Sequence, residues 1–118
     1  MLYLLQVLQA LAPVTAVRGN VDRGPWASGL PTTAALTIDQ VCVYVLHNLH
    51  DLALVPEAAG FRVVVSGHSH RPAIRERNGV LYVNPGSAGP RRFRAAVSVA
   101  LMEVQGTLVH ARLVPLDG

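Results

Sequence analysis

Four short polar segments stand out because each follows an apolar, strand-like run and contains residues that bind metal ions or bend the backbone. In layered α/β folds, functional sites lie in the loops just past strand ends. Neutral imidazole is also the commonest protein metal ligand. The four segments are therefore the candidates for a functional site. They are Arg18-Gly19-Asn20-Val21-Asp22, Val45-Leu46-His47-Asn48, Ser66-Gly67-His68-Ser69-His70 and Asn84-Pro85-Gly86-Ser87.

The histidines of these segments allow a metal site and also simpler interpretations. His68 and His70 lie two residues apart, so they can bind one metal ion or two adjacent ions, and Gly67 lets the backbone turn sharply there. Alternatively, both are solvated loop residues. His47 ends an apolar run, where a lone histidine is commonly a satisfied residue at the edge of the core. Asn20 alone would be a turn residue, because asparagine tolerates left-handed backbone.

Composition and charge narrow the class of protein. With 118 residues the chain forms one domain, residues 1–118. Hydrophobic residues are 51% and charged residues 14%, which excludes intrinsic disorder, and the single Cys42 excludes a disulfide scaffold. No run approaches the ~20 apolar residues of a membrane helix, and a net charge of +3 does not indicate nucleic-acid binding. We expect a cytoplasmic protein with no membrane partner.

The elements that position the four segments follow from the apolar patterns. Residues 1–12 predict an amphipathic helix; a signal peptide is the alternative, disfavoured because no Lys or Arg precedes the apolar run. Residues 48–60 predict a loop with a short helix closed by Gly60. Asn-Gly at 78–79 predicts a hairpin turn, and 105–106 predicts another. Eight strands are predicted, at 14–17, 34–38, 41–46, 62–66, 73–77, 80–83, 94–104 and 107–115.

The order of the four segments resembles a known family. Gly-Asn-x-Asp at 19–22, a strand that ends in His47, and Gly-His-x-His at 67–70 resemble the last three metal-binding blocks of the calcineurin-like metallophosphoesterases. The run at 81–87, which ends in Asn-Pro-Gly-Ser, is similar to the branch that holds the YfcE-type phosphodiesterases and Vps29. The resemblance spans roughly residues 8–116. It implies an α/β fold, a four-layer αββα sandwich.

In that family, two divalent metal ions are bridged by an aspartate and by a water or hydroxide that attacks phosphorus in line. The resemblance implies that Asn20, His47 and His68 bind one ion and that His70 binds the other. It also implies catalytic roles for Asn20 and His68. Oxygen and nitrogen donors without thiolate suit manganese, which the resemblance favours, and also iron, zinc or nickel. The implied function is hydrolysis of a small-molecule phosphodiester.

Two further features bear on the substrate. Arg71 and Arg91 are predicted to bind its phosphate, because guanidinium forks match phosphate oxygens; a solvated basic rim is the alternative. Val21 stands where many family members carry a general-acid histidine. Protonation of the leaving group is then weak or supplied elsewhere, so we expect activated phosphodiesters to be the better substrates.

The sequence departs from the family pattern at its start. The family begins with a strand that carries Asp-x-His and a second strand that ends in Gly-Asp, whose aspartate bridges the metal ions. The first aspartate here is Asp22, so the resemblance implies that the N-terminal third of the domain is missing. The alternatives to an enzyme are a non-catalytic scaffold for protein interactions, as in the Vps29 branch, and an inactive remnant. Uncovered sheet edges with no lysine predict a homo-oligomer.

Overall fold

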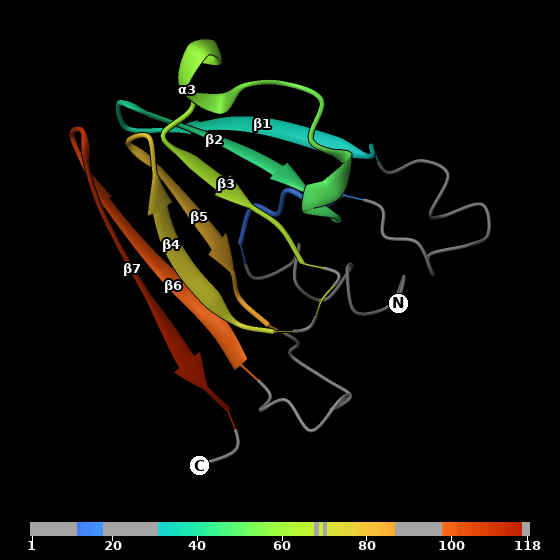
Figure 1. Cartoon of the computed structure of the whole chain (residues 1–118). Helices are drawn as coiled ribbons and strands as arrows, with labels where there is room; N and C mark the ends of the chain where they lie inside the picture. The colour runs from blue at the N-terminus through green and yellow to red at the C-terminus, as the bar shows by residue number, and fades with distance from the viewer. Residues whose placement is uncertain (1–11, 18–30, 68, 70, 87–97, 117–118) are drawn as a thin grey trace.

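A computed structural model describes residues 12–17, 31–67, 69, 71–86 and 98–116 (Figure 1). These residues form seven strands in two sheets and two short helical segments that connect β2 to β3. In chain order the elements are β1 (Thr33–Ile38), β2 (Val41–Leu46), η1 (Leu49–Asp51), α3 (Pro56–Ala59), β3 (Val63–Val65), β4 (Ala73–Arg77), β5 (Val80–Asn84), β6 (Ser98–Gln105) and β7 (Leu108–Pro115). No helix in the described ranges is long and apolar enough to cross a membrane.

The larger sheet has the strand order β1-β2-β3-β5-β4 and is parallel at its centre. β2, β3 and β5 run parallel to one another, while β1 and β4 pair antiparallel with their neighbours at the two sides. Strands of a parallel centre are buried on both faces, which matches the unbroken valine run of β3. The three parallel strands end at the same edge of the sheet.

Hairpin turns set the register of the antiparallel pairs. In the β4–β5 turn, Asn78 and Gly79 have φ of 54° and 76°, and two consecutive positive φ values are what a type I′ turn requires. The β6–β7 turn has Gly106 at φ 63°. The predicted turns at 78–79 and 105–106 are confirmed. The turn between β1 and β2 is tied to the β6–β7 turn, because Asp39 Oδ2 accepts a hydrogen bond from the Gly106 N–H.

The β6–β7 hairpin covers one face of the larger sheet (Figure 1). Buried Val41, Val43, Val63 and Val83 form the core between the two sheets, against partly buried side chains of the hairpin such as Met102. The alternation of side chains along each strand sends the intervening residues to the opposite face.

That opposite, outer face of the larger sheet holds a second cluster. Leu46, Val64 and Val80 are buried there and pack against Leu52, which follows η1. The described residues therefore supply the two sheets, and the segment that connects β2 to β3 packs on the outer face of the larger sheet through Leu52. As predicted, Gly60 ends α3 in the left-handed conformation, with φ 88°.

One predicted strand is absent from the described residues, and two predictions fall partly outside them. Residues 14–17 were expected to form a strand, but 12–17 contain neither strand nor helix. A strand requires a hydrogen-bonded neighbour, and none of the seven described strands pairs with this segment. The helix predicted at 1–12 lies outside the described residues except for residue 12. The strand predicted from 94 is described from Ser98 onward.

Candidate functional site

The carboxyl ends of β2, β3 and β5 bring three of the four polar segments to one sheet edge. His47 follows β2, Ser66 and Gly67 follow β3, and the Asn-Pro-Gly turn begins at the last residue of β5. Beyond the strands, the Gly67 N–H donates to the His47 carbonyl oxygen at 2.8 Å, and the Ser66 N–H donates to the Val83 carbonyl oxygen at 3.0 Å. The two segments that carry the predicted histidine ligands are thus joined directly through their backbones.

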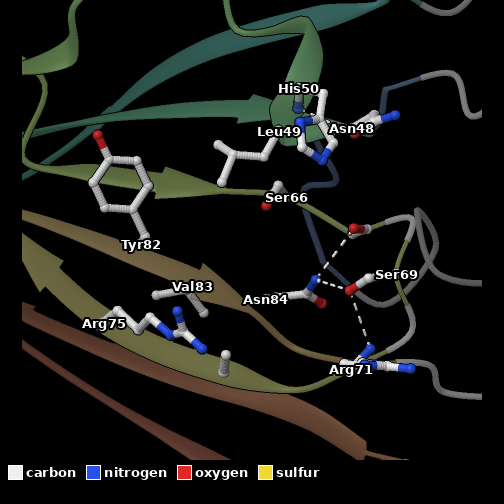
Figure 2. Close-up of a pocket in the computed structure, with 12 residues that line it drawn as sticks. Asn48, Leu49, His50, Ser66, Ser69, Arg71, Arg75, Tyr82, Val83 and Asn84 are labelled. Carbon is white, nitrogen blue, oxygen red and sulfur yellow. Dashed lines mark hydrogen bonds between the residues drawn. The ribbon is translucent and has the colours of Figure 1, made fainter.

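Asn84 holds the loop that follows β3. Its Nδ2 donates to the Gly67 carbonyl oxygen at 3.1 Å and to Ser69 Oγ at 3.0 Å (Figure 2). Its Oδ1 accepts from the Gly86 N–H at 3.0 Å. Both amide hydrogens and the carbonyl oxygen are therefore in use. Asn84 acts as a brace between the end of β5 and the loop that contains positions 68 and 70.

The turn after Asn84 is fixed from the second sheet. Ser98, a buried residue at the start of β6, donates from its Oγ to the Pro85 carbonyl oxygen at 2.7 Å. Gly86 has φ 83°, and a Cβ there would collide with Ser98 Oγ and crowd the Pro72 ring. Only glycine fits this position without strain. The Asn-Pro-Gly turn thus fixes the position of Asn84.

A pocket of about 350 Å³ opens beside this edge on the outer face of the larger sheet (Figure 2). Asn48, Leu49 and His50 border it from the η1 side, and Arg71 and Arg75 border it from the β4 side. Its remaining lining residues are Ser66, Gly67, Ser69, Ala73, Tyr82, Val83 and Asn84. None of these lining residues is an aspartate or glutamate.

The structure describes two of the six predicted site residues. His47 lies at the edge, is half-buried and has an interaction partner. Arg71 is exposed and lines the pocket. Asn20, His68, His70 and Arg91 lie outside the described residues, so their roles stay predictions. Within the described ranges no group of three His, Cys, Asp or Glu side chains could hold a metal ion.

Two residues that line the pocket were not predicted from the sequence as site residues. Arg75 and His50 are not among the six predicted site residues, yet both line the pocket. The signal that could have found Arg75 is the Asn-Gly turn. A two-residue turn fixes the pairs Arg75↔Tyr82 and Ala73↔Asn84, which places Arg75 on the same face as Asn84.

Comparison with known proteins assigns the family. Residues 2–107 match the calcineurin-like phosphoesterase superfamily domain. The chain belongs to this superfamily. It is 30% identical over 118 residues to a probable metallophosphoesterase of Methanothermobacter thermautotrophicus, a match that covers 94% of this chain and 67% of the relative. It is 31% identical over 122 residues to a probable metallophosphoesterase of Methanocaldococcus jannaschii, covering 97% of this chain and 60% of the relative.

A solved structure agrees at the level of the fold. Vps29 of Entamoeba histolytica, complexed with zinc, superposes with a TM-score of 0.71 at 22% identity, covering 94% of this chain and 74% of Vps29. This similarity confirms the predicted α/β fold, and the match over residues 2–107 confirms the predicted family. The chain is thus a member of a family of metal-dependent phosphoesterases.

Proposed function

We propose that this chain carries the site of a metal-dependent phosphodiesterase. The observation that supports the proposal best is the 2.8 Å hydrogen bond from the Gly67 N–H to the His47 carbonyl oxygen. This hydrogen bond holds two segments at one sheet edge, and these segments carry His47 and His68, which the resemblance to the superfamily predicts to be metal ligands. Convergence of these segments is the first requirement for a shared metal ion.

Asn20, His47 and His68 would hold one divalent ion and His70 would hold a second. Amide oxygen and imidazole nitrogen without thiolate fit manganese, iron, zinc or nickel, and manganese is the proposed ion. When bound, the ions lower the pKa of a bound water toward neutrality and stabilise charge on the phosphoryl oxygens. The role of the fold is positional, because Asn84 and the parallel strand ends keep the ligand-bearing loops in place.

Hydrolysis of bis(p-nitrophenyl) phosphate tests the proposal. The family site has seven ligand positions, and this sequence contains four of them, at Asn20, His47, His68 and His70. We therefore expect little turnover from these 118 residues alone. Fused to a family segment that carries the Asp-x-His and Gly-Asp blocks, the chain should show manganese-stimulated hydrolysis of bis(p-nitrophenyl) phosphate. It should hydrolyse this diester faster than the monoester p-nitrophenyl phosphate.

The matched control for that assay is a histidine away from the edge. His68→Ala should remove the manganese-stimulated activity of the fusion, and His110→Ala, which changes an exposed residue of β7, should retain it. Equal effects of the two substitutions would refute the site assignment. A fusion that folds, binds manganese and hydrolyses neither substrate would refute the phosphodiesterase proposal. A cytoplasmic location stays a prediction.

The second candidate function is a protein-interaction scaffold, which the similarity to the Vps29 fold favours. A scaffold has no need of a metal-dependent reaction. The folded, inactive fusion described above is therefore the outcome that would select this candidate.

A further inference from the structure

The pocket on the outer face of the larger sheet carries two cations that pair with no carboxylate of the described residues. Arg71 and Arg75 line it, and within the described residues neither guanidinium is paired with a carboxylate. Arg77 lies two residues beyond Arg75 on the same face of β4, yet it does not line the pocket. The positive charge therefore continues along this face of β4, and Arg75 is the arginine of the strand that borders the pocket.

Ser69 adds a hydrogen-bond donor to this side of the pocket. Its Oγ accepts from Asn84 Nδ2 at 3.0 Å and from the Arg71 N–H at 3.3 Å. A hydroxyl has two acceptor lone pairs and one donor hydrogen, so these two bonds leave the hydrogen available for an acceptor outside the loop. Ser69 is exposed and lines the pocket, so a bound anion can be that acceptor.

The opposite side of the pocket is apolar in part. Leu49 borders it from η1 and remains 40% exposed, and the half-buried Tyr82 ring lies between the two sides (Figure 2). An apolar side chain left in contact with water at a pocket wall gains from burial by a ligand. The pocket therefore combines a cationic, donor-rich side with an apolar side, which suits an organic anion with a flat apolar body.

The pocket extends from the proposed metal edge, where Ser69 and Asn84 line it, along the outer face of β4 to Arg75. Ala73 pairs with Asn84, and Arg75 lies two pairs farther from the edge, opposite Tyr82. Two residues of a strand span about 7 Å. A charge bound at Arg75 is therefore separate from a phosphoryl group at the strand ends.

We infer that this pocket is a subsite for one ester group of the substrate, and that this group is flat, apolar and itself carries an anionic group. Arg71, Arg75 and the Ser69 hydroxyl bind its anion, and Leu49 and Tyr82 contact its apolar body. The inference rests on the proposed function for the identity of the ligand as part of a phosphodiester. It adds a substrate class: phosphodiesters that carry a second negative charge on one organic group.

Binding of phenyl phosphate in the presence of EDTA tests the inference without metal ions or turnover. Phenyl phosphate represents the proposed ester group, and methyl phosphate is the same anion without the apolar body. Isothermal titration calorimetry should show that the 118-residue chain binds phenyl phosphate more tightly than methyl phosphate. Arg75→Gln should weaken this binding about three- to tenfold, as expected for one charge-assisted contact that is partly exposed to water.

Arg77→Gln is the matched control, because it removes the same charge from the same face of the same exposed strand. It should change the affinity for phenyl phosphate less than about twofold. Leu49→Ala should weaken phenyl phosphate binding and leave methyl phosphate binding unchanged. Equal effects of the two arginine substitutions, equal affinities for the two phosphates, or no saturable binding would each overturn the inference. Because the assay contains no metal ion, a failure of the proposed hydrolysis does not alter its result.

Discussion

Removing the Asn84 side chain tests whether this residue braces the candidate site. Asn84→Ala deletes three hydrogen bonds, to the Gly67 carbonyl oxygen, to Ser69 Oγ and from the Gly86 N–H. The bonds to Gly67 and Gly86 are partly buried, and the bond to Ser69 is exposed. A partly buried hydrogen bond contributes about 1 kcal/mol net, and an exposed one about half as much. We therefore expect Asn84→Ala to lower the free energy of unfolding by about 2–3 kcal/mol.

Asn84→Asp separates the two functions of the amide. The carboxylate still accepts from the Gly86 N–H, but an oxygen replaces the Nδ2 that lies 3.1 Å from the Gly67 carbonyl oxygen. Two acceptors at this distance repel each other, so the loss should be close to that of Asn84→Ala. The matched control is Asn48→Asp, which adds the same charge at the same pocket. Asn48 Oδ1 accepts from the His50 N–H at the start of η1, a role that aspartate fills equally well.

Urea denaturation followed by far-UV circular dichroism measures these differences. For Asn84→Ala and Asn84→Asp the midpoint should fall with an unchanged slope, whereas Asn48→Asp should stay within about 0.5 kcal/mol of the parent chain. An Asn84→Ala chain as stable as the parent would refute the brace. The loop after β3 would then be held by its backbone bonds alone.

Three further predictions concern packing and association. Gly86→Ala should lower the free energy of unfolding by about 2–4 kcal/mol, because it adds a collision with Ser98 to the strain of a positive φ. Gly79 has φ 76° and a Cβ there would meet no other atom within 4 Å, so Gly79→Ala should lower it by only about 1 kcal/mol in the same denaturation assay. Val63→Ala should lower the free energy of unfolding by about 2 kcal/mol because Val63 is 0% exposed, whereas Val55→Ala should leave it nearly unchanged because Val55 is 57% exposed. Equal losses of stability for the two substitutions would contradict the core assignment. Light scattering should detect dimers or larger species, because β6 pairs only with β7 in the described part of the chain and the sequence has no lysine to guard an edge; a monomer at high concentration would contradict this.

Local signals in the sequence anticipated most of the described fold. The Asn-Gly pair at 78–79 located a hairpin because two positive φ values leave few residue types, and Gly60 located a helix end for the same reason. Seven of the eight predicted strands are present. The exception, 14–17, shows the limit of such signals, since β-branched residues favour extended backbone but only a paired neighbour makes a strand.

The sequence predicted which loops form the site, but it did not predict the contacts between them. The segment order identified the family, and strand ends located the edge, because parallel strands must finish together. Nothing in the sequence indicated that the Asn84 amide donates both its hydrogens to the loop after β3. Nor did it indicate that Arg75 lines the pocket and Arg77 does not. Both depend on the relative placement of β3, β4 and β5, which single-sequence patterns do not encode.

Manganese binding to the 118-residue chain tests the central claim most directly, that the edge formed by β2, β3 and β5 is a metal centre. Calorimetric titration should give at most one tightly bound ion per chain, since three of the four proposed ligands belong to one ion. His47→Ala and His68→Ala should each weaken binding at least about tenfold while circular dichroism shows an intact fold. His110→Ala should bind as the parent chain does. Manganese affinity unchanged by His47→Ala and His68→Ala, or lowered equally by all three substitutions, would contradict the account.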